Sequence, residues 1–181
     1  MLFRFCLLTV VFVSCWSCNN SKTPKNITVA YFDNARFFEQ ETIRLREAKT
    51  RETKTVVSNG KSETIEISTI DWEKELRVFR QITLNKSSFS GKYHIDSLKN
   101  GALKTTRYSR IDEKLPIVYL AYGDSLGKIV WVESKSQEIS QLINNEMSWR
   151  YVPDSGYAVH GFQKILGGSE SAFKISVNFE N

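Results

Sequence analysis

From Tyr93 onward, the pattern of apolar and polar residues is that of short strands, and in the last segment the two kinds alternate with a period of two. This last segment is AFKISVNFE (172–180), in which every second residue from Phe173 to Phe179 is apolar. Such alternation predicts a β-strand with one buried and one solvated face. β-branched and aromatic content predicts six further strands, at 92–98, 102–111, 115–122, 128–134, 146–152 and 157–166.

Short turn sequences separate these strands. Lys99-Asn100-Gly101, Pro153-Asp154-Ser155-Gly156 and Gly167-Gly168 are rich in residues that tight turns favour. Connections this short join neighbouring antiparallel strands. The pattern therefore predicts an up-and-down antiparallel β-sheet.

The segment 31–49 has a helical period instead. Asp33 or Asn34 can cap its start. Its apolar side is formed by Phe37, Phe38, Thr42 and Leu45. The spacing predicts one amphipathic helix whose apolar stripe faces a core.

The segment 68–84 predicts a second helix. Ser68 and Asp71 fit a capping box at its start. Its apolar stripe consists of Trp72, Leu76, Phe79 and Ile82. We expect this stripe to belong to the core as well.

Between the two helices, Asn59-Gly60 separates two β-rich runs, which is the strongest short signal for a β-hairpin. That turn would place Val56, Ile65 and Ile67 on one face. The predicted fold class is therefore α+β: two N-terminal helices with an intervening β-hairpin, packed on one face of a C-terminal antiparallel up-and-down β-sheet.

The start of the chain has the pattern of an export signal. Arg4 precedes an apolar run from Phe5 to Val13, which is too short to span a bilayer as a helix. The run continues into Ser14-Cys15, and VFVSC (11–15) resembles the lipobox of bacterial lipoproteins, in which the peptidase cuts before a cysteine that carries diacylglycerol. Cys15 is the predicted lipid attachment site. Cys18 is the alternative, disfavoured because an indole would occupy a position that the lipobox reserves for small or aliphatic residues.

These signals divide the chain into a signal peptide (1–14), a lipidated cysteine with a polar tether (15–28) and a single α+β domain (29–181). Cleavage before Cys15 leaves 167 of the 181 residues, a suitable length for one core. All three cysteines lie within the first 18 residues, so the domain has no disulfide framework. We expect it to be a monomer.

The charge of the mature chain is mild. Loss of Arg4 leaves 24 basic against 20 acidic residues, a net charge of +4. The densest basic run, from Arg44 to Lys54, is interrupted by Glu47 and Glu52. Nucleic-acid binding needs a concentrated basic stripe, so we do not expect it.

The stretch Gly123-Asp124-Ser125-Leu126-Gly127 matches the G-x-S-x-G nucleophile elbow and the motif of the GDSL esterases. An elbow needs a strand, a sharp turn and then a helix. Here the segment 128–132 is β-branched and aromatic, which predicts a strand. The chain also lacks the D-x-x-H that those esterases carry near the end of the domain. We therefore expect a hairpin loop, no catalytic residue and no enzyme.

The spacing of histidines and glycines does not predict a metal site or a cofactor site. His94 and His160 have no partner at H-x-x-x-H or H-E-x-x-H spacing, so no metal site is predicted. No cofactor is predicted either, because Gly167-Gly168 lacks the lysine and helix of a phosphate loop. The acidic residues Glu39 and Glu41 are expected on the solvated face of the first helix.

Four segments, YFDNARFFEQE, SNGKSET, IDWEKEL and YVPDSGYAVHGFQK, in this order, resemble a family of small envelope lipoproteins of Bacteroidota-type bacteria. The resemblance covers most of the mature chain. It implies an envelope lipoprotein and brings no activity to any residue. Surface-exported lipoproteins of that group often carry acidic residues just after the lipidated cysteine. The segment 16–22 has none, which favours the periplasmic face of the outer membrane.

Two functions are favoured over an enzyme. The first is a non-enzymatic partner-binding or accessory module at the outer membrane. The alternative is a lipid or apolar-ligand binder with helices over a curved sheet. A filled core would favour the first, and we expect one because both helical stripes are broad. The aromatic residues concerned are Tyr119, Tyr122, Trp131, Trp149, Tyr151, Tyr157, Phe162, Phe173 and Phe179.

Overall fold

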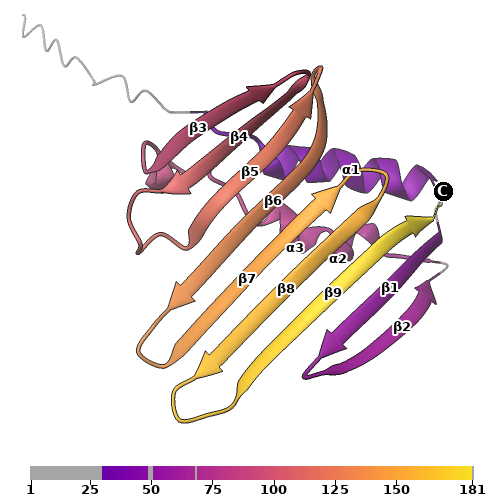
Figure 1. Ribbon diagram of the computed structural model, residues 1–181, viewed down its shortest axis with the longest axis vertical. Coiled ribbons are helices and arrows are strands. Elements are labelled where there is room, and N and C mark those ends of the chain that lie inside the picture. The colour runs from indigo at the N-terminus through magenta and orange to yellow at the C-terminus, as the bar shows by residue number, and fades with distance from the viewer. Residues whose placement is uncertain (1–29, 49–50, 68, 181) are drawn as a thin grey trace, which may run out of the picture.

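The computed structural model describes residues 30–48, 51–67 and 69–180. Within these ranges the protein is mostly β, with nine strands in a single antiparallel sheet. Helical structure is limited to α1 (Asn34–Ala48), two single-turn helices, α2 (Trp72–Glu75) and α3 (Arg77–Arg80), and the 3-10 turn η1 (Ser87–Phe89). Figure 1 shows the helices lying behind one face of the sheet. No helix in the described ranges is long and apolar enough to cross a membrane.

The strands follow the predicted order along the chain. They are β1 (Arg51–Ser58), β2 (Lys61–Ile67), β3 (Tyr93–Asn100), β4 (Leu103–Arg110), β5 (Ile117–Ser125), β6 (Lys128–Ile139), β7 (Ile143–Val152), β8 (Gly156–Ile165) and β9 (Glu170–Glu180). From β3 to β9 each strand pairs with the next, so the predicted up-and-down antiparallel sheet is confirmed.

The α+β prediction is correct only in part, because the described residues are mostly β and have only a few short helices. The β1–β2 hairpin also does not pack on a face of the sheet. It extends the sheet instead, and the strand order is β2-β1-β9-β8-β7-β6-β5-β4-β3. β1 pairs with β9 from Arg51↔Glu180 to Ser58↔Phe173. This pairing satisfies backbone groups along β9 that would otherwise form an open edge.

Two of the tight turns share one geometry, which the sequence predicts for the first of them, Asn59-Gly60. Asn59 and Gly60 have φ of 49° and 80°, and Leu126 and Gly127 have φ of 55° and 84°. Positive φ at both central residues is typical of the type I′ turn, whose twist matches that of a two-residue hairpin. As predicted, Val56, Ile65 and Ile67 share one face of the first hairpin.

Helix α1 forms where it is predicted, and Asp33 caps it by accepting a hydrogen bond from the Arg36 N–H at 3.1 Å. The prediction of one long second helix is wrong. The chain breaks at Leu76 (φ −85°, ψ 0°) into α2 and α3. Asp71 is itself the N-cap of α2, and its side chain accepts from the Lys74 N–H. Ser68, the other half of the predicted capping box, lies outside the described residues.

The break between α2 and α3 lets two rings meet different parts of the sheet. Trp72 packs edge-on against Phe179 in β9, whereas Phe79 packs against Trp149 in β7 and Tyr157 in β8. Phe38 from α1 stacks on Phe79 at 5.2 Å between ring centroids. Rings therefore fill the space between these helices and the central strands.

We call the sheet face that contacts the helices the helix side and the other face the uncovered side. Period-two alternation places Met147, Trp149 and Tyr151 together on the helix side, as predicted. Not all of the nine aromatic residues belong to this core. Tyr119, Trp131 and Phe162 fall on the uncovered side, because their immediate neighbours in sequence point to the helices.

Candidate functional site

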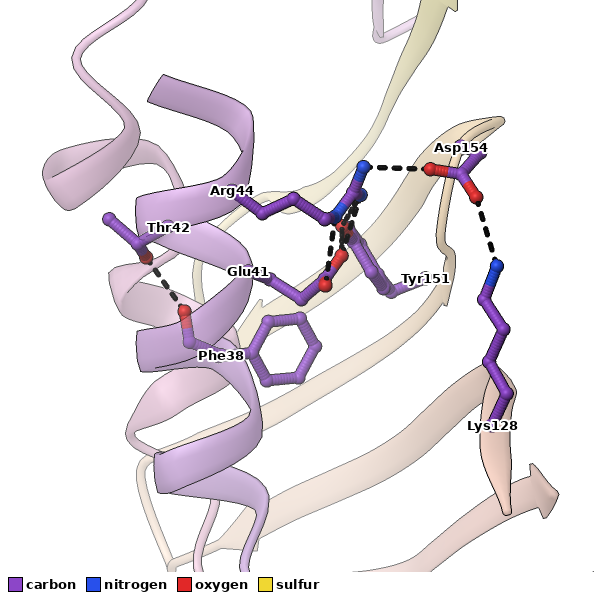
Figure 2. A network of polar contacts seen from close by, with 7 residues as sticks. All are labelled: Phe38, Glu41, Thr42, Arg44, Lys128, Tyr151 and Asp154. Carbon is purple, nitrogen blue, oxygen red and sulfur yellow. Dashed lines mark hydrogen bonds and ion pairs between the residues drawn. The ribbon is translucent and has the colours of Figure 1, made fainter. Parts of the chain in front are cut away.

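Among the described residues, a connected group of polar side chains joins α1 to the helix side of the sheet (Figure 2). The Tyr151 hydroxyl donates to Glu41 Oε2 at 2.5 Å, and the Arg44 guanidinium donates to both Glu41 oxygens at 2.7 and 3.0 Å. Arg44 also reaches Asp154 in the β7–β8 turn at 2.7 Å. Lys128 lies 3.6 Å from the second oxygen of Asp154. The network therefore links α1, β7 and two turns of the sheet.

Burial and charge set the protonation states in this network. Burial raises the pKa of Tyr151, and the neighbouring Glu41 carboxylate raises it further. The hydrogen bond from Arg44 to Glu41 raises the pKa of Arg44, so the guanidinium stays charged. The phenol is thus a neutral hydrogen-bond donor and is poorly suited to act as a general base.

A second tyrosine forms a parallel arrangement one strand away. Tyr157 is the direct cross-strand partner of Tyr151, and its hydroxyl donates to Glu75 at the end of α2. Glu75 pairs with Lys54 Nζ of β1 at 2.6 Å. Burial raises the pKa of Tyr157, as does its hydrogen bond to Glu75. Helices α1 and α2 are therefore each joined to the sheet by a group that consists of a tyrosine, a carboxylate and a cation.

The prediction that Glu41 lies on the solvated face of the first helix is wrong. Only 8% of Glu41 is exposed, whereas Glu39 is exposed as expected. A signal for this was present in the sequence, since Glu41 follows Phe38 by three residues and so lies on the apolar stripe of the helix. A carboxylate in such a stripe needs a buried donor, and Tyr151 supplies it.

The residues that the sequence offered for catalysis or metal binding are not brought together. Ser125 is the last residue of β5 and pairs with Lys128 across the hairpin, so the predicted strand is confirmed after this motif. The loop is shorter than predicted, since only Leu126 and Gly127 lie between the strands. His94 lies on β3 and His160 on β8, both exposed. Within the described residues, no group of three His, Cys, Asp or Glu is arranged to hold a metal ion.

The uncovered side carries a stack built around Trp131 of β6. A Cβ at Gly123 would be 2.3 Å from the indole Nε1, so the ring lies directly over this glycine. The Arg150 guanidinium lies over the indole at 4.7 Å from its ring centroid. Glu133 holds Arg150 in place through an ion pair of 2.7 Å. The first glycine of the G-x-S-x-G match therefore makes room for a tryptophan.

A second stack of the same type lies nearby on this side. The Arg107 guanidinium of β4 lies 3.6 Å from the ring centroid of Tyr119 in β5. Next to Arg150 lies a shallow hollow of about 250 Å³, lined largely by small side chains. Its lining includes Arg150, Val152, Ala158 and Ser176. Arginine–aromatic stacks beside a hollow form the candidate functional site.

No protein-family model matches this chain, and no curated protein is similar to it.

Proposed function

We propose that this protein is a non-enzymatic, lipid-anchored envelope protein whose uncovered sheet side binds a protein partner. The observation that carries the proposal is the pair of stacks, Arg150 on Trp131 and Arg107 on Tyr119. Tryptophan, tyrosine and arginine are the residues most enriched among the energetic hot spots of protein interfaces. A stacked guanidinium is also held in place before binding, which lowers the entropy lost on association.

In this function the helices are a permanent cover of the other side of the sheet. Phe38 and Phe79 are fully buried, and the two tyrosine–carboxylate contacts fix α1 and α2 to the strands. A partner would therefore meet a rigid sheet whose helix side is already occupied. The VFVSC segment (11–15) supports anchoring at Cys15, and we infer a monomer on the periplasmic face of the outer membrane.

The test is capture of the partner from native membranes by full-length tagged protein. Trp131→Ala and Arg150→Ala should each weaken binding of the captured protein by about tenfold or more, as expected for hot-spot residues. Phe173→Ala removes an exposed ring from the helix side of β9, and Arg77→Ala removes an exposed cation from α3. Both variants should bind like the wild type. Equal binding by all four variants would contradict the proposal.

A second function, binding of a lipid or apolar ligand, is supported by a different hollow. It measures about 330 Å³ and lies beyond the helices, between the ends of β6, β7, β8 and β9. Met147, Gly161 and Phe173 contribute to its lining. This volume lies at the lower end of the range for small-molecule sites. Native mass spectrometry of the purified protein would support this function if it detects an adduct that Met147→Glu removes.

A further inference from the structure

Five large aliphatic side chains are exposed at one end of the sheet. They lie in and beside the β6–β7 and β8–β9 turns and consist of Ile139 (68% exposed), Leu142 (66%), Ile143 (39%), Ile165 (45%) and Leu166 (73%). We call this set the apolar tip. Figure 1 shows both turns at the lower end of the sheet, beyond the helices. Among the described residues, the helices leave all five side chains at least 39% exposed.

The two turns form one surface. Ile143 and Ile165 are direct cross-strand partners, and the Leu166 N–H donates to the Leu142 carbonyl at 2.9 Å. The aliphatic side chains of the two turns are therefore held next to one another by the backbone. Exposed apolar groups that gather in this way mark an interaction surface more often than isolated ones do.

The backbone of the β6–β7 turn is largely satisfied by the turn itself. Ser140 Oγ accepts hydrogen bonds from the N–H groups of Leu142 and Ile143 at 3.3 and 3.0 Å. The Ser140 N–H donates to the Ile143 carbonyl at 2.8 Å. Polar groups that already have partners lose little when they leave water, so this turn can enter an apolar medium at a low desolvation cost.

The charged residues beside the tip include equal numbers of cations and carboxylates. The flanking strand segments carry three cations and three carboxylates: Lys135, Lys164, Lys174, Glu138, Glu146 and Glu170. Two ion pairs neutralise four of them, Lys135–Glu146 at 2.8 Å and Lys164–Glu170 at 2.6 Å. This balance fits a zwitterionic phospholipid surface, which neither repels nor strongly attracts a set of residues with no net charge.

The composition and position of the tip favour lipid over protein. It contains no Trp, Tyr or Arg, and leucine is under-represented among protein hot spots. The tip lies in two turns at the end of the sheet, whereas the stacks lie on its face, on β4, β5, β6 and β7. Aliphatic side chains gain free energy in acyl chains without any complementary pocket.

The predicted anchor can reach the same bilayer. The described chain begins beside β3 and β4, where Tyr31 packs against Tyr93 and Tyr108. β6 has 12 residues and spans about 40 Å. The 15 Cα–Cα steps from Cys15 to Ala30 span at most about 54 Å, which is enough to reach the membrane at the other end of β6.

We propose that the apolar tip inserts into the phospholipid bilayer as a second membrane contact and sets the strands upright on it. The inference rests on the proposed lipid anchor. It would direct the uncovered side sideways into the periplasm, where a partner has access. A second, weaker membrane contact matters because it fixes the orientation that the anchor alone leaves free.

The test uses the full-length lipidated protein in phosphatidylcholine vesicles whose acyl chains are brominated, which quenches nearby tryptophan fluorescence. Leu142→Trp places a probe in the tip. Leu126→Trp places a matched probe in the β5–β6 turn, at the other end of the sheet and 90% exposed in the wild type. We expect brominated lipid to quench the added emission of Leu142→Trp and to leave that of Leu126→Trp unchanged. Adding Leu166→Asp to Leu142→Trp should reduce the quenching.

Three outcomes would overturn the proposal. If the wild type floats with the vesicles but Leu142→Trp is quenched no more than Leu126→Trp, the anchor stands and the tip proposal fails. If the wild type does not float, both fail, because neither contact holds the protein on lipid. If Leu142→Trp is insensitive to brominated lipid but shifts to the blue when envelope membrane proteins are added, the tip binds a protein.

Discussion

The indole of Trp131 lies directly over Gly123. This contact explains why position 123, the first glycine of the G-x-S-x-G match, has no side chain. A Cβ at position 123 would be 2.3 Å from Nε1 and 2.6 Å from Cε2 of the ring. Gly123→Ala would therefore displace the indole or shift the β5–β6 pairing. We expect a loss of about 1–3 kcal/mol in the free energy of unfolding, as for an overpacked site.

Urea titration and tryptophan fluorescence measure this effect. Gly168→Ala is the matched control, because a Cβ there would meet nothing nearer than 3.3 Å. It should change stability by less than half as much. If Gly123→Ala unfolds like the wild type and keeps the Trp131 emission, the ring does not occupy the position described.

Phe79 should be among the most costly residues to truncate. It is fully buried and contacts the rings of Phe38, Trp149, Tyr151 and Tyr157. Phe79→Ala is expected to lower the free energy of unfolding by about 3–5 kcal/mol, because it removes a large side chain and leaves a cavity. Phe173→Ala, at a ring that is 40% exposed, should cost less than half of that. Equal losses would mean that the helices do not cover the sheet permanently.

Stability should fall at alkaline pH. The folded protein raises the pKa of Tyr151 and Tyr157 above the 10.0 of an unburied tyrosine, mainly by burial. Both phenols therefore keep their protons in the folded state at a pH where the unfolded chain loses them. Their contribution is fully present below about pH 10 and declines as the pH rises above it, since the folded state then binds more protons.

The double variant Tyr151→Phe, Tyr157→Phe separates this contribution from others. Its free energy of unfolding should decline less steeply above pH 10 than that of the wild type. Part of the decline should remain, because burial also raises the pKa of Tyr93 and Tyr108 to about 12. Parallel curves for the two proteins, measured by denaturant titration across that range, would contradict the assignment.

Lipid attachment is predicted at Cys15. A diacyl pair at one thioether buries many methylene groups, each worth about 0.8 kcal/mol, so Cys15→Ser should release the protein from membranes or stall its processing. Cys18→Ser should behave like the wild type. Metabolic labelling with an acyl analogue and detergent partition measure both variants. A label that is lost from Cys18→Ser and kept by Cys15→Ser would move the site to Cys18.

The strands could be predicted from the sequence because alternation and turn chemistry are local. Asn59-Gly60 and the 172–180 segment are examples in which a few neighbouring residues determine the structure. The break at Leu76 could not be predicted, since the stripe from Trp72 to Phe79 fits an unbroken helix equally well. What separates α2 from α3 is the position of rings on distant strands, a tertiary effect that a local pattern does not contain.

The same limit applies to the candidate site. Arg107, Tyr119, Trp131 and Arg150 come from four strands, and their stacking depends on register across the sheet. Alternation along a single strand could have shown that Trp131 and Val132 point to opposite faces of the sheet, and hence that Trp131 points away from the core. It could not have shown that Arg150 would lie over it. Buried Glu41 was closer to being predictable, because its helical stripe alone indicates it.

The pairing of β1 with β9 has a consequence for how the protein folds. The β1–β2 hairpin can close as soon as residue 67 is available, but the other partner of β1 is β9, the last strand in the described residues, since Arg51 pairs with Glu180. Contacts so far apart in sequence slow folding, because a long loop must close before they form. The first hairpin therefore stays unattached to the rest of the sheet until β9 has been made and can pair with β1.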